Sequence, residues 1–306
     1  MKADFSENVY YGHIVKGDLT AAIDYVKQFP EQARRYERFR AIFEQEQYIC
    51  YEADAWINDI LIAYQQYYRE VFYLCIGKEN AAGKLRGRLA EYLEITDEDI
   101  ELCDMEQNQI TEAFRRKGFH FLGGRTSGYY GPYIWQTTES RTYEVELPDG
   151  IQTYTVKFLD GFIARSWPDY LSFGEIGTGG WTDADGIINC IRASYDPDSE
   201  TFKVSLLKHE AQHARDLSIH KNMSSEDLEY RAKLVELIYS VERNLLEQFA
   251  REAASSDKSN GHASAAERIL DGFAEKLKLR HGEMSRLPAE EIHTTARILF
   301  EESYIL

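Results

Sequence analysis

The chain has 306 residues, of which 43% are hydrophobic and 13% aromatic, so it can bury a core and is not a disordered polypeptide. Its length allows one large domain or two smaller ones. Its formal net charge of −17 argues against binding to nucleic acid or to an anionic membrane surface, because both would repel it.

The first residues contain no apolar run behind a basic end, and no stretch reaches the length of a transmembrane span. The four cysteines are scattered without a Cys-x-x-Cys pair, which is typical of reduced thiols. We therefore expect a cytoplasmic protein that does not bind membranes. The sequence does not predict its oligomeric state.

Residues 1–118 have apolar and aromatic side chains at helical spacing, which predicts a mostly helical N-terminal region. Asp18 precedes the first of these segments, and Pro30 ends it. The expected helices cover approximately residues 19–29, 31–48, 51–76, 81–93 and 97–116. We expect the aromatic stripes to form a core rather than a ligand surface.

The pattern changes after Gly118, where glycines and aromatic residues alternate. Two runs with a period of two residues, 141–147 and 151–158, flank a turn signal at 148–150, which predicts a β-hairpin. The glycines at 177–181 match no phosphate-binding loop, so we expect a tight turn there. A β-branched, apolar run at 186–195 predicts a further strand.

The next segment contains the sequence His209-Glu210-Ala211-Gln212-His213. On an α-helix the two histidines lie one turn apart on the same face, so both imidazoles could bind one Zn²⁺. Glu210 would then lie beside the open side of the metal. The alternative is a pair of surface histidines on an ordinary amphipathic helix.

A catalytic zinc also needs a third protein ligand and a free position for water. His220 follows His213 by seven residues, and on a continuous helix it would be about 10 Å away, too far to bind the same ion.

A carboxylate on the following helix is the better candidate for the third ligand. Ser224 and Asp227 form a capping-box-like start for that helix. Glu229 flanks its expected buried face. Glu236 and Glu226 remain alternatives.

His209, His213 and Glu229, with Ala232 three residues later, resemble the gluzincin pattern of zinc metallopeptidases. The resemblance extends from His209 to about Leu237. It implies a zincin-like catalytic domain that binds one Zn²⁺ per chain through the two histidines and Glu229. It also implies a peptide or protein substrate.

The resemblance implies hydrolysis by a water that the zinc activates, with Glu210 as the general base. Asp216 is a candidate for fixing the tautomer of a ligand histidine, with a solvated acid beside Arg215 as the alternative. Zincins often steady the oxyanion with a His, Tyr or Arg. The candidates for that role are Tyr195, Tyr230, Arg231 and His293, among which the sequence does not choose.

In zincin-like enzymes an edge strand just before the metal helix pairs with extended substrate, because its unpaired backbone groups can extend the sheet. The candidate residues for this substrate strand are Ile188, Asn189, Cys190 and Ile191. The alternative is an ordinary central strand.

The rest of the chain is expected to be helical, with a second helix from about 227 to 254 and a polar loop at 255–261. Further helices are expected at 263–279 and 290–303.

The predicted fold class is therefore α+β. A helical N-terminal region (1–118) precedes a zincin-like metallopeptidase domain (119–306), which is strand-rich over 119–195 and helical over 200–306. This domain would have a small mixed β-sheet. Two other functions remain open: an interaction or regulatory protein with a structural or degenerate metal site, and a metal-dependent hydrolase of a non-peptide amide.

Overall fold

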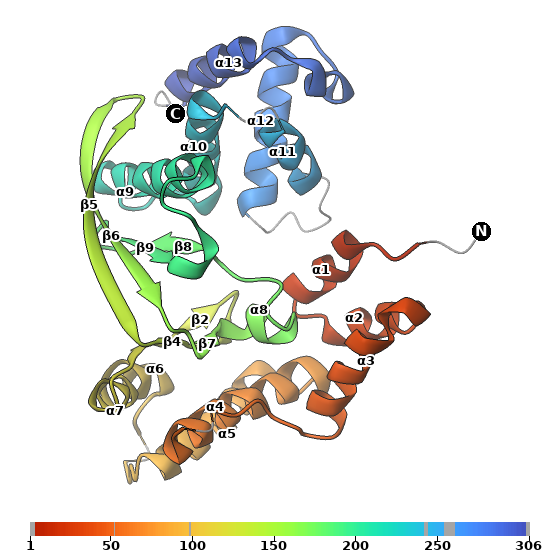
Figure 1. Ribbon diagram of the computed structural model, residues 1–306, viewed down its shortest axis with the longest axis vertical. Helices are drawn as coiled ribbons and strands as arrows, with labels where there is room; N and C mark the ends of the chain where they lie inside the picture. The colour runs from red at the N-terminus through yellow and green to blue at the C-terminus, as the bar shows by residue number, and fades with distance from the viewer. Residues whose placement is uncertain (1–3, 52, 98, 242–243, 254–260, 304–306) are drawn as a thin grey trace. The chain divides into compact units, whose positions relative to one another are not determined.

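The computed structural model describes residues 4–51, 53–97, 99–241, 244–253 and 261–303 (Figure 1). Over these residues helices combine with small β-sheets, which confirms the predicted α+β class. The chain divides into two compact units. Unit 1 consists of Met1–Thr137 and Gly161–Gly177, and unit 2 of Thr138–Asp160 and Thr178–Leu306.

The boundary expected at residue 118 lies inside unit 1. Strand β1 (His120–Leu122) follows directly after that point and contacts helix α7 (Thr111–Arg116). Its central residue, Phe121, is buried and stacks on Phe114 of α7, with ring centroids 5.3 Å apart. The first strand after the helices therefore completes their core.

Unit 1 has an aromatic core surrounded by helices. These helices are α1 (Glu7–Val15), α2 (Leu19–Val26), α3 (Ala33–Phe39), α4 (Ala55–Tyr68), α5 (Lys78–Tyr92), α6 (Leu102–Met105), α7 and α8 (Ser166–Leu171). Asp54 starts α4 by accepting a hydrogen bond from the backbone N–H of Ile57. Several helices end in or begin from single π-helical turns, at Arg40–Glu44, Arg69–Tyr73 and Glu106–Ile110. Including these turns, the helices expected at 31–48 and 51–76 extend over residues 33–44 and 55–73, so both are shorter than predicted.

Two small sheets complete unit 1. Strands β1, β4 (Tyr133–Trp135) and β7 (Ala164–Arg165) form an antiparallel sheet in the order β1-β4-β7. Strands β2 (Arg125–Thr126) and β3 (Tyr129–Tyr130) form an antiparallel pair.

Unit 2 contains a mixed four-stranded sheet in the order β5-β6-β9-β8. Strands β5 (Thr137–Leu147) and β6 (Gly150–Asp160) form the predicted hairpin around the turn at 148–150. Strand β9 (Ile188–Ile191) is parallel to β6, and β8 (Gly180–Thr182) is antiparallel to β9.

The strand that we considered for substrate binding is central rather than at the edge. All four residues of β9 are buried, and β9 pairs with β6 on one side and β8 on the other. Among the described strands, β8 and β5 are therefore the two edges of the sheet, and β8 is the edge next to β9. The glycines permit this pairing: a Cβ atom on Gly180 would come 2.5 Å from the carbonyl oxygen of Asn189.

The helices of unit 2 follow the sheet in sequence. A π-helical segment, Thr201–Lys208, leads into α9 (His209–Ile219). The others are α10 (Ser225–Tyr239), α11 (Leu245–Ala253), α12 (Gly261–Leu277) and α13 (Ala289–Glu302), with short 3₁₀ turns at Arg192–Ser194 and His281–Arg286. Figure 1 shows the β5–β6 hairpin on one side of α9 and α10, with α11 and α12 on the other.

The second helix expected over 227–254 is two helices, because α10 ends at Tyr239. Ser240 has extended backbone angles and its hydroxyl donates to Glu200, 40 residues earlier in the chain. Most of the polar loop expected at 255–261 lies outside the described residues. None of the described helices is both long enough and apolar enough to cross a lipid bilayer.

Candidate metal centre

The two motif histidines lie on α9, one turn apart, as their spacing predicts. Their ring centroids are 4.6 Å apart and the ring planes are perpendicular. Their side chains are only 10% and 13% exposed for His209 and His213. Both imidazoles are thus held on the inner face of α9 rather than in solvent.

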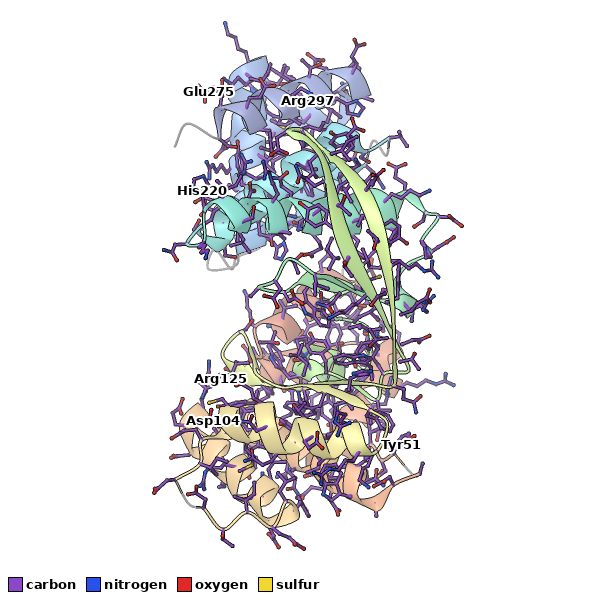
Figure 2. All side chains as sticks on the ribbon, turned by 90° about the vertical axis from the view of Figure 1, so that its left-hand side faces the viewer. Tyr51, Asp104, Arg125, His220, Glu275 and Arg297 are labelled. Carbon is purple, nitrogen blue, oxygen red and sulfur yellow. The ribbon has the colours of Figure 1, made fainter. Side chains whose placement is uncertain are left out.

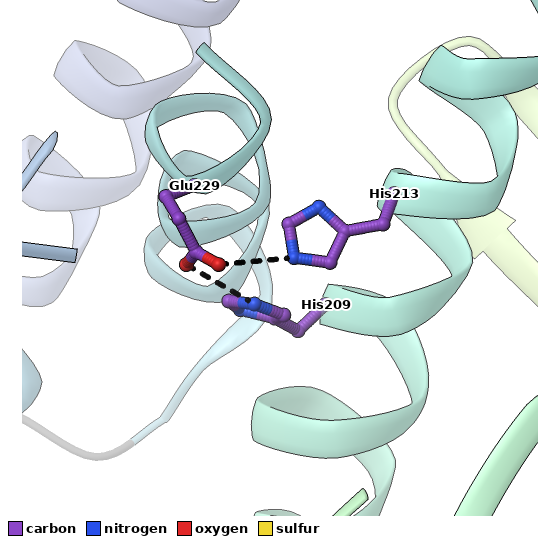
Figure 3. Close-up of side chains that lie close together, drawn as sticks. All are labelled: His209, His213 and Glu229. Atoms are coloured by element: carbon purple, nitrogen blue, oxygen red, sulfur yellow. Dashed lines mark ion pairs between the residues drawn. The ribbon is translucent and has the colours of Figure 1, made fainter. Parts of the chain in front are cut away.

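Glu229 of α10 faces this pair. Ser224 caps the start of α10 by accepting from the backbone N–H of Asp227, as the capping-box pattern predicts. In Figure 3 the Glu229 carboxylate faces both rings, and a dashed line joins each of its oxygens to one of them. Its Oε2 atom is 3.5 Å from Nε2 of His209, and its Oε1 atom is 3.5 Å from Nε2 of His213.

The spacing of these atoms suits a divalent ion. One donor atom from each of the three residues lies within 4.8 Å of the others. Around a tetrahedral zinc with bonds of about 2.0–2.1 Å, neighbouring ligand atoms lie about 3.3 Å apart. The two 3.5 Å distances are close to this value and longer than an ordinary N–H···O hydrogen bond of about 2.9 Å.

Unsatisfied polar atoms in this group also favour a bound cation. Oε2 of Glu229 and Nδ1 of His213 are buried and make no hydrogen bond, although Nδ1 of His262 lies 2.8 Å from this Oε2 atom as an ion-pair contact. A buried polar atom without a partner is costly, and a bound cation would remove that cost for the carboxylate. This buried His/His/Glu group could therefore hold a metal ion.

Glu236, one of the alternative ligands, has another position. Its Oε1 atom is 2.7 Å from Nδ1 of His209, on the ring nitrogen that does not face Glu229. The carboxylate therefore fixes the ring so that Nε2 points into the cluster. Glu226, the other alternative, accepts a hydrogen bond from Ser264 at 2.7 Å. Of the three carboxylates that the sequence left open, Glu229 joins the histidines.

The cluster is strongly coupled electrostatically. Burial alone would lower the pKa of His209, but Glu229 and Glu236 outweigh it and raise that pKa to about 10. Burial would raise the pKa of Glu229, but His209, His213 and His262 hold it far below its usual range. Without metal the group is an ion pair, so a metal ion must replace a proton to bind.

The side chain of Glu210 contacts the edge strand β8 through a hydrogen bond. The hydroxyl of Thr182, on β8, lies 2.7 Å from Oε2 of Glu210 and can donate to it. The phenol of Tyr195 lies against the residue before β8, because a Cβ atom on Gly179 would come 2.6 Å from its hydroxyl. Burial raises its pKa to about 12, with further contributions from Cys190, Glu210 and Glu236. Tyr195 thus remains a hydrogen-bond donor at neutral pH.

Asp216 does not contact a ligand histidine. Its Oδ2 atom accepts from Nε of Arg231 at 2.8 Å and its Oδ1 atom from Gln212 at 2.9 Å. The two charged side chains are 1% and 2% exposed. This buried pair joins α9 to α10, and Nη1 of Arg231 also donates to Ser303.

The other predicted residues lie away from the cluster. The ring of Tyr230 lies under the guanidinium of Arg268, 3.9 Å from its centroid. Nε2 of His293, on α13, is 2.8 Å from the carbonyl oxygen of Ser240. His220, labelled in Figure 2, is an exposed residue past the end of α9 and is not in the metal-binding group.

The sequence analysis considered Glu236 only as an alternative metal ligand, and it missed the contacts of Thr182 and His262. Glu236 lies seven residues after Glu229, two helical turns along the same face, so its role beside the ligand could have been inferred from spacing. Thr182 and His262 gave no such signal, because each reaches the site from a distant part of the chain. Nδ1 of His262, at the start of α12, is 2.8 Å from Oε2 of Glu229.

The chain matches no protein-family model, no curated protein and no solved structure.

Proposed function

We propose that this chain is a zinc metallopeptidase of the gluzincin type, which hydrolyses peptide bonds. The observation that supports this most is the meeting of His209 and His213 of α9 with Glu229 of α10, beside Glu210. Three donors on two adjacent helices leave a coordination position for water, as a catalytic zinc requires.

The donor set favours zinc and a catalytic role. Two imidazoles and one carboxylate suit Zn²⁺ better than Ca²⁺ or Mg²⁺, which prefer oxygen ligands. A structural zinc is usually closed by four ligands, often cysteines, and none of the four free cysteines joins the group. When bound, Zn²⁺ would lower the pKa of a water and polarise the substrate carbonyl.

The side chains around the cluster have matching roles. Glu210 accepts the proton of the attacking water and passes it to the leaving nitrogen. The Thr182 hydroxyl donates to Oε2 of Glu210, which leaves Oε1 as the proton acceptor. Tyr195, which is protonated at neutral pH and lies beside Gly179 just before β8, is the best placed of the predicted candidates to donate to the developing oxyanion.

The edge strand β8 supports a peptide as the substrate. It pairs with β9 on one side, and no other described strand covers its free side. An extended peptide could add to this edge through backbone hydrogen bonds. Because Thr182 joins β8 directly to Glu210, such a peptide would lie beside the general base.

A Glu210→Gln variant tests this proposal. The zinc-loaded wild type should cleave members of a mixed peptide library, read by mass spectrometry. Glu210→Gln should keep its zinc and lose about 10²–10⁴-fold in rate, because an amide cannot take the proton. Glu247→Gln, at an exposed position on α11, is the matched control and should remain active. Undiminished cleavage by Glu210→Gln, or a zinc-loaded wild type that cleaves no peptide, would contradict the proposal.

A further inference from the structure

His262 contacts the proposed metal ligand Glu229 from a third helix. It lies in the first turn of α12, and its Nδ1 atom is 2.8 Å from Oε2 of Glu229. A carboxylate oxygen can only accept, so at this distance Nδ1 carries its proton, although the contact is not aligned as a hydrogen bond. Its side chain is 55% exposed, whereas that of Glu229 is 12% exposed. His262 thus reaches a nearly buried carboxylate from the solvent side.

The packing of α12 on α10 fixes the place of His262. Gly261 lies so close to α10 that a Cβ atom there would come 2.6 Å from Oγ of Ser225. One turn further on, Ser264 donates to Glu226 at 2.7 Å. The next contact is between Arg268 and Asp227, also 2.7 Å apart. These contacts align the first two turns of α12 with the start of α10, so the approach of His262 to Glu229 is built into the fold.

His262 is not one of the three candidate metal ligands. The donor atoms that lie within 4.8 Å of one another come from His209, His213 and Glu229, and His262 is outside this group although it contacts one of its members. Its ring is therefore positioned behind the carboxylate. It lies against Oε2, which also faces Nε2 of His209, whereas Oε1 faces Nε2 of His213.

We propose that His262 is a positioning residue, which holds the Glu229 carboxylate in the orientation that binds Zn²⁺ through one oxygen. This inference rests on the proposed metal centre. A carboxylate with both oxygens free can turn about its terminal torsion, and a fixed donor on one oxygen removes that freedom before the metal arrives. Outer partners of metal ligands typically contribute 10–100-fold in metal affinity.

The test measures the zinc dissociation constant by competition with a chromophoric chelator at pH 7.5. His262→Ala should bind zinc about 10–100-fold more weakly than the wild type. His262→Asn, whose side-chain amide puts an N–H donor near the position of Nδ1, should bind within about threefold of the wild type. His281→Ala is the matched control, because His281 is a 49% exposed histidine that pairs with Asp271 at 3.1 Å, and its affinity should not change.

A second readout distinguishes positioning from ligation. Replacing zinc by Co²⁺ gives visible absorption bands that depend on the ligand set, and these bands should keep their positions in His262→Ala. A shifted spectrum would show that His262 is a ligand and overturn the positioning role, as would a His262→Ala variant that binds zinc as tightly as the wild type. A wild type that binds no zinc would instead contradict the proposed metal centre and this inference together.

Discussion

The Nδ1 atom of His209 lies 2.7 Å from the Oε1 atom of Glu236, and both side chains are nearly buried, at 10% and 7% exposure. The contact spans from α9 to α10 and orients Nε2 of His209 toward Glu229. A carboxylate on the far nitrogen of a histidine sets its tautomer and increases its basicity as a ligand. Helix α10 thus supplies both the carboxylate of the candidate metal-binding group and the residue that orients one of its histidines.

Removing the Glu236 carboxylate should therefore weaken metal binding without removing a ligand. We expect Glu236→Ala to lower zinc affinity about 10–100-fold and Glu236→Gln to lower it less, because an amide oxygen still accepts from Nδ1–H. Chelator competition measures both constants, with Glu247→Ala as the control. Equal affinities for Glu236→Ala and the wild type would show that the contact does not support the site.

The ion pair between Asp216 and Arg231 should stabilise the crossing of α9 and α10. Asp216→Ala leaves the buried guanidinium uncompensated, so it should cost about 3–5 kcal/mol in the free energy of unfolding. Replacing Arg231 by Met in the same chain should recover part of this loss, because the unpaired charge is then gone.

Urea denaturation gives the free energies for this comparison. The exposed pair of Lys276 and Glu302 is the matched control, and Lys276→Ala should cost less than about 1 kcal/mol. The role assigned to the buried pair fails if Asp216→Ala is no more costly than Lys276→Ala.

Glu106 in unit 1 should make stability depend on pH. Burial raises its pKa to about 7, although Tyr64 and the backbone N–H of Gly124 donate to the carboxylate and partly offset this. In the unfolded chain its pKa is near 4.5. The folded state therefore binds more protons between these values, so stability falls as pH rises from about 4.5 to 7.

The difference between the folded and unfolded pKa values of Glu106 sets the size of this change. It lowers the free energy of unfolding by an amount on the order of 3 kcal/mol in total. The comparison is with Glu106→Gln, which cannot titrate. The stability of the wild type relative to this variant should fall between pH 4.5 and 7 and then stay level, as measured by urea denaturation across the range. A relative stability that does not change with pH, or that rises, would contradict the assigned pKa.

Local patterns explain which parts of the site could be predicted. The spacing of His209 and His213 requires only a helix, and the cap at Ser224 fixes where the next helix begins and where Glu229 points. The turn at 148–150 predicts the β5–β6 hairpin for the same reason, because the signal lies within a few residues.

Contacts between distant segments explain the rest. Whether β9 is central or at the edge depends on its pairing with β6 and β8, which the strand itself does not encode. Helix α10 ends at Tyr239 where Ser240 binds Glu200, and His262 reaches Glu229 through the docking of α12. None of these partners is close in sequence, so periodicity could not reveal them.

The metal content of the purified protein tests the central claim most directly. Elemental analysis of the wild type, beside a His213→Ala variant, should find about one zinc per chain in the former and loss of that zinc in the latter. Absence of zinc from the wild type, with none taken up when zinc is added, would contradict the metal centre. The motif would then be a pair of histidines held by Glu229 and Glu236 in an ion-paired helix interface.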